Sequence, residues 1–118
     1  MTPTSPPAPR PEPAGQVIEE IAAERRRQVE VEGWTPEHDD RHDRGEMALA
    51  AAAYAGETGT YGSGLIGRIK GLCWPWDAAW WKPKNPRRDL IRAAALIVAE
   101  IERLDRAALA RATSSAAP

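Results

Sequence analysis

The segment from Glu32 to Glu46 gathers the side chains of this chain that are best suited to chemistry. It reads EGWTPEHDDRHDRGE, and it contains both histidines, six carboxylates and one of the five tryptophans. Carboxylates crowded onto one surface repel one another unless water, a cation or basic side chains compensate their charge. The segment is therefore the first candidate for a functional site.

Two sets of metal ligands can be drawn from this segment. If a helix begins near Asp39, then Asp39, Asp43 and Glu46 share one side, and three carboxylates suit Mg²⁺ or Mn²⁺. His38, His42 and Glu46, at four-residue intervals, suit Zn²⁺ or a similar ion instead. The two sets compete, because one helix cannot direct both of them at a single ion. The structural alternative is a hydrated helix start whose aspartates interact favourably with the helix dipole.

A second candidate segment is rich in tryptophan and then in basic residues. Residues 74–81 read WPWDAAWW and hold four of the five tryptophans. Four basic residues follow at once: Lys82, Lys84, Arg87 and Arg88. Aromatic faces beside cations suit stacking on a base and pairing with phosphate. Core packing is the alternative for most of these tryptophans, because the chain has no phenylalanine to fill its core. We expect at least one of them, Trp80 or Trp81, to face a groove.

The composition limits the class of protein. The formal net charge of −1 gives no case for general nucleic-acid binding, which needs a clear basic surplus. No apolar run approaches the ~20 residues needed to cross a bilayer, and the N-terminus lacks the apolar core of a signal peptide. The single cysteine, Cys73, fits a reducing compartment. These features predict a cytoplasmic protein that does not enter membranes.

The elements that position these side chains are expected to be helices. No part of the chain alternates at period two for long enough to indicate a strand. We predict helices over residues 16–32, 41–55 and 85–110, which makes an all-α bundle of three to four helices. Thr35-Pro36 and Asn85-Pro86 are each typical of an N-cap followed by proline at the first helical position.

Each predicted helix has a face that we expect to be buried. The residues of the first are Val17, Ile18, Ile21, Ala22 and Val29. Those of the second are Met47, Ala50, Ala51 and Tyr54. Those of the third are Leu90, Ala94, Ile97, Ile101 and Leu104, with Ile91 and Val98 widening the face. The third helix is long enough for this apolar seam to extend into a contact between two copies, so we expect a homo-oligomer.

Three further segments are expected to lack regular structure. Residues 1–15 are proline-rich and predict a disordered arm, and residues 111–118 predict a disordered tail. Between them, residues 16–110 are expected to form a single helical domain. Six of the nine glycines lie in residues 56–71, which indicates a flexible loop after a helix that ends at Gly56.

Two segments resemble known proteins. IAAERRRQVEVEGWTPEHDD is similar to the ERxRQ…WG…H opening of phage and actinobacterial MazG-like proteins, and LIRAAALIVAEIERLDR is similar to their closing helix. The whole pattern over about residues 17–106, with GEMALAAAAYA, WPWD and WWKP, also resembles a family of small phage and prophage proteins to which no activity is assigned. A further likeness, of EGWT…DD…H, is to the ryanodine-receptor repeat domain, a ligand-binding helical module.

The MazG resemblance implies an all-α nucleoside triphosphate pyrophosphohydrolase that holds Mg²⁺ with a Glu-x-x-Glu pair on one helix and a Glu-x-x-Asp pair on the next. Asp43 and Glu46 have the spacing of the first pair. Glu102 and Asp105 have the form of the second, but they lie near the end of the last predicted helix. Arg92 and alanines occupy the positions where that helix should carry its early carboxylates. The resemblance therefore supports the fold more than the catalysis.

Three functions are consistent with these observations. The first is a phage-type nucleotide-binding protein that acts as a divergent, Mg²⁺-dependent pyrophosphohydrolase, with Asp43 and Glu46 as catalytic residues. The second is a non-catalytic binder of a nucleotide-derived signal, of an anti-defence type. The third is a helical protein-interaction module. For the first two, we expect the ligand to contact Trp34, Trp80, Trp81, Lys82, Arg87 and Arg88.

Overall fold

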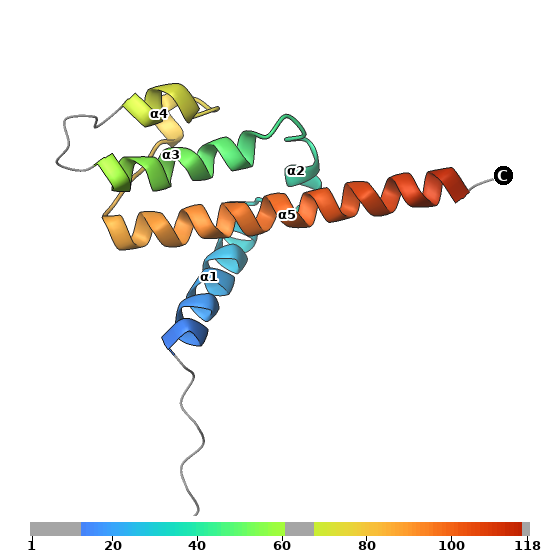
Figure 1. Cartoon of the computed structure of the whole chain (residues 1–118), viewed down its shortest axis with the longest axis horizontal. Helices are drawn as coiled ribbons and strands as arrows, with labels where there is room; N and C mark the ends of the chain where they lie inside the picture. The colour runs from blue at the N-terminus through green and yellow to red at the C-terminus, as the bar shows by residue number, and fades with distance from the viewer. Residues whose placement is uncertain (1–12, 61–67, 117–118) are drawn as a thin grey trace, which may run out of the picture.

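The longest helix, α5 (Pro86–Ala116), is the element against which three of the other helices pack (Figure 1). The computed structural model describes residues 13–60 and 68–116. Before α5 come α1 (Pro13–Glu30), α2 (Pro36–Asp40), α3 (Glu46–Thr60), α4 (Arg68–Cys73) and a 3₁₀ helix (Ala78–Trp80). Within the described ranges no residue lies in a strand, so the predicted all-α class is confirmed. None of these helices is both long enough and apolar enough to cross a bilayer.

The core lies between α3 and α5, which run side by side in opposite directions (Figure 1). The stripe predicted for α3, Met47, Ala50, Ala51 and Tyr54, is buried as expected. From α5, Ala93, Leu96 and Ala99 complete the same apolar cluster. Because most of these side chains are alanines, the two helix axes can approach closely and leave little room for larger side chains.

The stripe predicted for α1 is not its buried face: Ile21 and Val29 are only half-buried, and Ala22 is exposed. Val17 and Ile18 are 41% and 64% exposed, whereas the buried residues of α1 are Glu24 and Gln28.

Helix α1 crosses α5 at a steep angle (Figure 1). Ion pairs join the two helices through Glu20, Glu24 and Arg25 of α1. The apolar periodicity of α1 predicts the wrong buried face. The face that is buried carries Glu24, which forms an ion pair with α5, and the periodicity of one helix does not reveal such a pair.

The seam predicted for α5 is also largely exposed. Leu90, Ile97, Ile101 and Leu104 are each about half exposed, at 48%, 48%, 53% and 50%. The buried face is instead the one that carries the small residues facing α3, together with Ile91. Close packing against an alanine-rich partner selects the alanine face, although the larger residues form the more regular heptad pattern.

Several helix ends differ from the prediction. Helix α1 begins at Pro13 rather than Gln16, and α5 continues to Ala116 rather than about Ala110. The remaining residues of the predicted arm and tail lie outside the described residues. Helix α3 begins at Glu46 rather than Arg41, because Gly45, at φ +82°, adopts the left-handed conformation that interrupts a helix. Helix α1 ends at Glu30 rather than at residue 32, and Gly33, at φ +76°, lies in the connection that follows.

Gly56 does not end α3, which continues to Thr60. Its role is packing, because a Cβ atom at this position would collide with the side chain of Ile69 on α4. A Cβ atom at Gly59, on the same helix, would meet nothing within 4 Å. The middle of the predicted glycine-rich loop, residues 61–67, lies outside the described residues, and its last part forms α4.

These two glycines make a matched pair of test sites. We expect Gly56→Ala to lower the free energy of unfolding by about 1–3 kcal/mol, because α4 must move or Ile69 must leave its rotamer. Gly59→Ala is expected to raise it by up to about 1 kcal/mol through helix propensity alone. Urea unfolding followed by circular dichroism measures both. Equal stabilities for the two variants would contradict the close approach of α4.

Candidate ligand-binding site

A short helix positions the first histidine. Thr35 is the N-cap of α2, its hydroxyl accepts a hydrogen bond from the backbone N–H of His38 at 3.2 Å, and Pro36 occupies the first turn. The cap and proline predicted here are therefore confirmed. Because α2 has only five residues, its direction is set by this cap and by side-chain contacts with α1 and α5.

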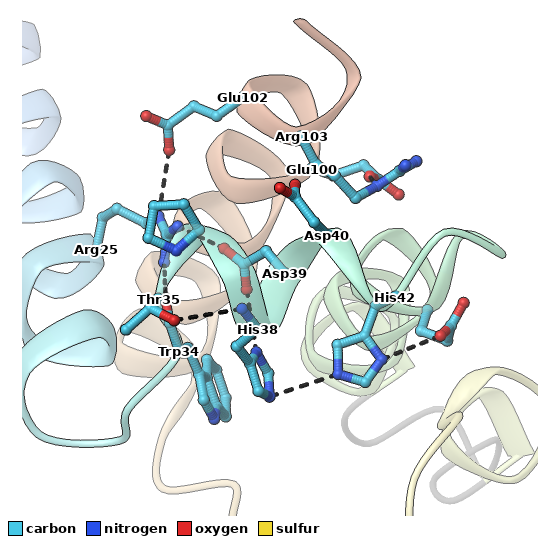
Figure 2. A network of polar contacts seen from close by, with 12 residues as sticks. Arg25, Trp34, Thr35, His38, Asp39, Asp40, His42, Glu100, Glu102 and Arg103 are labelled. Carbon is cyan, nitrogen blue, oxygen red and sulfur yellow. Dashed lines mark hydrogen bonds and ion pairs between the residues drawn. The ribbon is translucent and has the colours of Figure 1, made fainter. Parts of the chain in front are cut away.

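The two histidines form the centre of a polar chain (Figure 2). His38 Nδ1 lies 3.3 Å from Asp39 Oδ1, and His42 Nδ1 lies 3.0 Å from Glu46 Oε2. A carboxylate only accepts, so each Nδ1 atom carries the proton of its contact. The two Nε2 atoms are 3.4 Å apart, and at most one proton can lie between them. Both Nε2 atoms are thereby turned away from the carboxylates.

Two ion pairs, one buried and one on the surface, hold α2 in place. Arg25 on α1 donates to Asp39 Oδ2 at 2.5 Å and to the carbonyl oxygen of Trp34 at 3.2 Å. The Asp39 side chain is only 1% exposed, and that of Arg25 is 11% exposed. Asp40 pairs with Arg106 of α5 on the surface. The acidic segment is therefore neutralised largely by arginines from neighbouring helices.

A pocket of about 400 Å³ opens beside the two histidines. Its walls are mostly aromatic and come from two stretches of the chain that are far apart in sequence. The lining residues are Glu32, Trp34, His38, His42, Trp74, Trp76, Asp77 and Trp80. We call this cavity the aromatic pocket.

The rings of the aromatic pocket support one another. Trp34 lies parallel to His38 at 6.2 Å between ring centroids, and His42 meets the edge of Trp76 at 5.4 Å. Trp74 makes edge-to-face contacts with both Trp76 and Tyr54, and Tyr54 belongs to the core between α3 and α5. Rings held by edge-to-face contacts of this kind keep a defined shape. The Trp74 indole N–H also donates to the Asp77 carbonyl oxygen at 3.0 Å, which closes the loop before the 3₁₀ helix.

A second, smaller cavity of about 60 Å³ adjoins the aromatic pocket, because Glu32, Trp34 and Trp80 line both. The rest of its wall is formed by polar and basic side chains and by two residues of the core. These residues are Glu24, Arg27, Gln28, Tyr54, Lys82, Arg92 and Leu96. We call it the polar cavity. Lys82 also lies over the Trp80 ring, with Nζ 5.8 Å from the centroid.

Glu24 is the most deeply buried acid of the polar cavity, at 2% exposure. Burial by itself would raise its pKa, but hydrogen bonds from Arg27 and Arg88 lower the pKa below the usual value for glutamate. On the surface, a hydrogen bond from Arg87 lowers the pKa of Glu20. Burial raises the pKa of Tyr54, whose ring faces the Arg92 guanidinium.

The lowered pKa of Glu24 predicts a pH dependence of stability. The folded pKa lies below the unfolded one, so the carboxylate stabilises the fold above the unfolded value of about 4.5 and loses this effect as pH falls through the folded pKa. We expect Glu24→Gln to be less stable than the parent at pH 7 and the difference to shrink on acidification. Urea unfolding at pH 7, 5 and 4 measures it.

Glu20→Gln is the control for this pH series. Its pair with Arg87 is exposed to solvent, so its removal should change the stability much less at every pH. A Glu24→Gln variant whose deficit stays constant from pH 7 to 4 would contradict the role given to the ionised carboxylate.

The structure brings together only some of the predicted site residues. Trp34, His38, His42 and Trp80 share the aromatic pocket, and Lys82 lies in the adjoining cavity. Trp80 is 59% exposed. Trp81, in contrast, stacks on Tyr54 against the core. Arg87 and Arg88 pair with Glu20 and Glu24.

The proposed metal ligands are not gathered around one point. Asp39 faces Arg25, Asp43 is exposed, and Glu46 accepts from His42 and from the Arg44 N–H. Among residues 13–60 and 68–116, no three histidine, cysteine or acidic side chains are arranged to hold an ion. The carboxylate set for Mg²⁺ does not fit this arrangement. In the set for Zn²⁺, the two histidine Nε2 atoms lie 3.4 Å apart, but the Glu46 carboxylate faces His42 Nδ1 instead. Metal binding therefore stays a prediction from the sequence.

Sequence reasoning missed several residues of the site. Gln28 and Arg92 read as ordinary helix-surface residues, yet both line the polar cavity. The sequence indicates Trp74, Trp76 and Asp77 only as parts of a tryptophan-rich segment, although they form one wall of the aromatic pocket. The WPWD pattern is the available signal, since a proline and an N-capping aspartate among the tryptophans indicate a rigid loop rather than a helix face.

A comparison with protein-family models found no match, and comparisons with curated proteins and with solved structures found none either.

Proposed function

We propose that this protein binds a nucleotide or nucleotide-derived small molecule, with the base in the aromatic pocket. The observation that carries the proposal is the adjacency of two cavities of different chemistry, one aromatic and one polar and basic, which share three residues. A nucleotide has the same two parts, a flat apolar ring and a polar, charged remainder. The volume of about 400 Å³ lies within the range of small-molecule sites, roughly 300–1,000 Å³.

The aromatic pocket suits a flat ring that can also donate hydrogen bonds. Indole and imidazole faces stack on any base, and each such contact contributes about 1–3 kcal/mol. Glu32 and Asp77 add carboxylate acceptors at the walls. Amino groups of a base would donate to them, whereas a phosphate would be repelled. The phosphate is therefore expected outside this pocket, beside Lys82.

The arrangement favours a binder over a hydrolase. Two of the three acids that would hold Mg²⁺, Asp39 and Glu46, are engaged with Arg25 and His42. Two of the predicted phosphate ligands, Arg87 and Arg88, are engaged with glutamates of α1. A protein of this design would sequester a nucleotide-derived signal, which is the anti-defence role expected of a phage-type protein. The divergent MazG-like pyrophosphohydrolase is the alternative, and one experiment separates the two.

That experiment uses the eight common nucleoside triphosphates. Calorimetric titration of the full chain, with and without Mg²⁺, measures binding, and release of pyrophosphate measures turnover. We expect binding of at least one nucleotide without pyrophosphate release and with little dependence on Mg²⁺. Release of pyrophosphate would support the pyrophosphohydrolase in place of the non-catalytic binder. The absence of a binding signal with all eight triphosphates would contradict nucleotide binding altogether.

Trp80 offers the least disruptive variant, because its side chain is largely exposed. We expect Trp80→Ala to weaken nucleotide binding by about 10- to 100-fold through lost stacking, and to leave the thermal unfolding temperature nearly unchanged. Leu72→Ala, which removes an exposed apolar side chain outside both cavities, is the matched control and should bind like the parent. Binding by Trp80→Ala equal to that of the parent would remove this ring from the site.

Two further properties are proposed with this function. We place the protein in the cytoplasm, where nucleotides are found. We also expect self-association through the apolar side chains that α5 leaves exposed, Ile97, Ile101 and Leu104 among them. Sedimentation velocity at micromolar concentration decides the second point, because a monomer at all concentrations would exclude it.

A further inference from the structure

The two histidines of the aromatic pocket turn the same ring nitrogen toward each other. His38 Nδ1 faces Asp39 Oδ1 at 3.3 Å, and His42 Nδ1 faces Glu46 Oε2 at 3.0 Å. Because a carboxylate only accepts, each neutral ring keeps its proton on Nδ1 and carries a lone pair on Nε2. The two Nε2 atoms are 3.4 Å apart (Figure 2). Lone pairs at this distance repel each other unless a positive charge lies between them.

A shared proton or a metal ion can supply this positive charge, and the distance favours the ion. A hydrogen bond donated by an N–H group usually spans about 2.7–3.2 Å between its heavy atoms. Two nitrogen ligands of a tetrahedral zinc ion, each about 2.0–2.1 Å from the metal, lie about 3.3–3.4 Å from each other. The separation of 3.4 Å between the two Nε2 atoms is therefore long for a shared proton and matches two ligands of one ion.

The opposite side of each ring is held as it is in a metal ligand. Histidines that bind a metal almost always donate their other N–H to a carboxylate or carbonyl oxygen, which fixes the tautomer and the ring orientation. Asp39 and Glu46 provide these acceptors. Asp39 is itself held by Arg25 at 2.5 Å, and Glu46 also accepts from the Arg44 N–H at 2.7 Å. Two acids that the sequence suggests as metal ligands thus orient the histidines instead.

The backbone and the neighbouring rings fix the positions of both histidines. The His42 N–H donates to the carbonyl oxygen of Asp39 at 2.9 Å, so the chain makes a further turn after α2. His38 stacks on Trp34, and His42 meets the edge of Trp76. Because these contacts already order the two side chains, little conformational freedom is lost when an ion binds.

The pair of Nε2 atoms is accessible from the aromatic pocket. Both rings line that pocket, and the His38 and His42 side chains are 28% and 22% exposed. Among residues 13–60 and 68–116, no third histidine, cysteine or acid joins them in an arrangement that could hold an ion. Two positions of a tetrahedral ion are therefore left for water or for a ligand in the pocket, as in zinc sites that bind ligands.

We propose that His38 and His42 bind one divalent transition-metal ion of the zinc class through their Nε2 atoms. Imidazole is a preferred ligand of such ions, whereas Mg²⁺ prefers oxygen ligands. The ion lies in the wall of the aromatic pocket and turns its open positions toward the interior of that pocket. The inference goes beyond the proposed function and does not depend on it, because the ion needs only the two histidines and water.

The test is a calorimetric titration of the full chain with Zn²⁺, without a histidine tag and in a buffer that does not bind metals. We expect one ion per chain with a Kd on the order of 10 μM, because two protein ligands hold an ion less tightly than the four of a structural site. Nuclear magnetic resonance of the ring nitrogens should show Zn²⁺ shifting the Nε2 signals, and Mg²⁺ leaving them unchanged. Absence of Zn²⁺ binding would overturn the proposal, identify the contact as a shared proton and leave nucleotide binding untouched.

Three variants locate the ion. His38→Gln and His42→Gln each remove one ligand and should weaken Zn²⁺ binding about tenfold or more. Cys73→Ser is the matched control, because it removes the only thiol of the chain, which does not line the pocket, and it should bind like the parent. Circular dichroism establishes folding, and if one histidine variant does not fold, the other decides together with the Nε2 signals of the parent. Parent-like Zn²⁺ binding by a folded histidine variant, or its loss in Cys73→Ser, would overturn the assignment.

Discussion

Replacing Asp39 by alanine is expected to lower the free energy of unfolding by about 3–5 kcal/mol, the largest effect of any single substitution considered for this protein. The Asp39 side chain is 1% exposed and receives a hydrogen bond from Arg25 at 2.5 Å. Removal of the carboxylate leaves the Arg25 guanidinium nearly buried without its main counter-charge. A charge desolvated in this way costs far more than the loss of a surface pair.

Asp40→Ala is the matched control, because it makes the same change one residue later on α2. Asp40 is half exposed and pairs with Arg106 in contact with solvent, so its loss should cost about 0–1 kcal/mol. Urea unfolding of both variants at pH 7 measures the difference. Similar values for the two would show that burial does not govern the strength of the Asp39 pair.

A milder substitution at the same position also tests the site. Asp39 Oδ1 lies 3.3 Å from His38 Nδ1, so the carboxylate orients the imidazole that lines the aromatic pocket. Asp39→Asn keeps the side-chain shape and should retain part of the stability. If the carboxylate orients His38, Asp39→Asn should still weaken nucleotide binding in the folded protein. Unchanged binding would mean that His38 is held by its stacking with Trp34 alone.

Replacing Ala50 by leucine is expected to have the second-largest effect, a loss of about 2–3 kcal/mol in the free energy of unfolding. Ala50 is fully buried where α3 packs against α5. Three added carbon atoms at this position must push the two helices apart or displace neighbouring side chains of the same buried cluster. Tyr54 lies one turn further along α3 and supports Trp74, so the shift should reach the wall of the aromatic pocket as well.

Ala52→Leu provides the control for this prediction. Ala52 lies on the exposed face of the same helix, and leucine and alanine have similar helix propensities. Its stability should therefore stay within about 0.5 kcal/mol of the parent. Thermal unfolding followed by circular dichroism compares the two. A stable Ala50→Leu variant would mean that α3 and α5 can separate without cost, contrary to the close packing that the alanines permit.

Local sequence signals predict a structural feature correctly where the chemistry of the neighbouring backbone decides it. Thr35 with Pro36 and Asn85 with Pro86 each begin a helix as predicted, because a capping side chain and a preset φ act within one turn. The buried face of α3 was also predictable, because its apolar and small residues repeat at the helical period and one partner covers them. These features depend on neighbours within a few residues.

The candidate site shows where such signals end. Glu24 and Gln28 are polar residues at ordinary helical spacing, and nothing near them in sequence indicates burial. Their surroundings include Arg88 and Arg92, which lie more than sixty positions away. Likewise, the two walls of the aromatic pocket, around His38 and around Trp76, are separated by the whole of α3 and α4.

The amino-acid sequence by itself determined the all-α class, two helix starts and the residue types from which a base-binding site can be built. Only the tertiary structure decided which faces of α1 and α5 are covered, that the acids of α2 meet arginines rather than one ion, and that the tryptophans and histidines enclose a common pocket. The physical reason is the distance along the chain over which each kind of interaction acts. Caps and periodicity act over one or two turns, whereas burial, ion pairing and pocket shape depend on which distant segment lies opposite, and several apolar faces competed for that place.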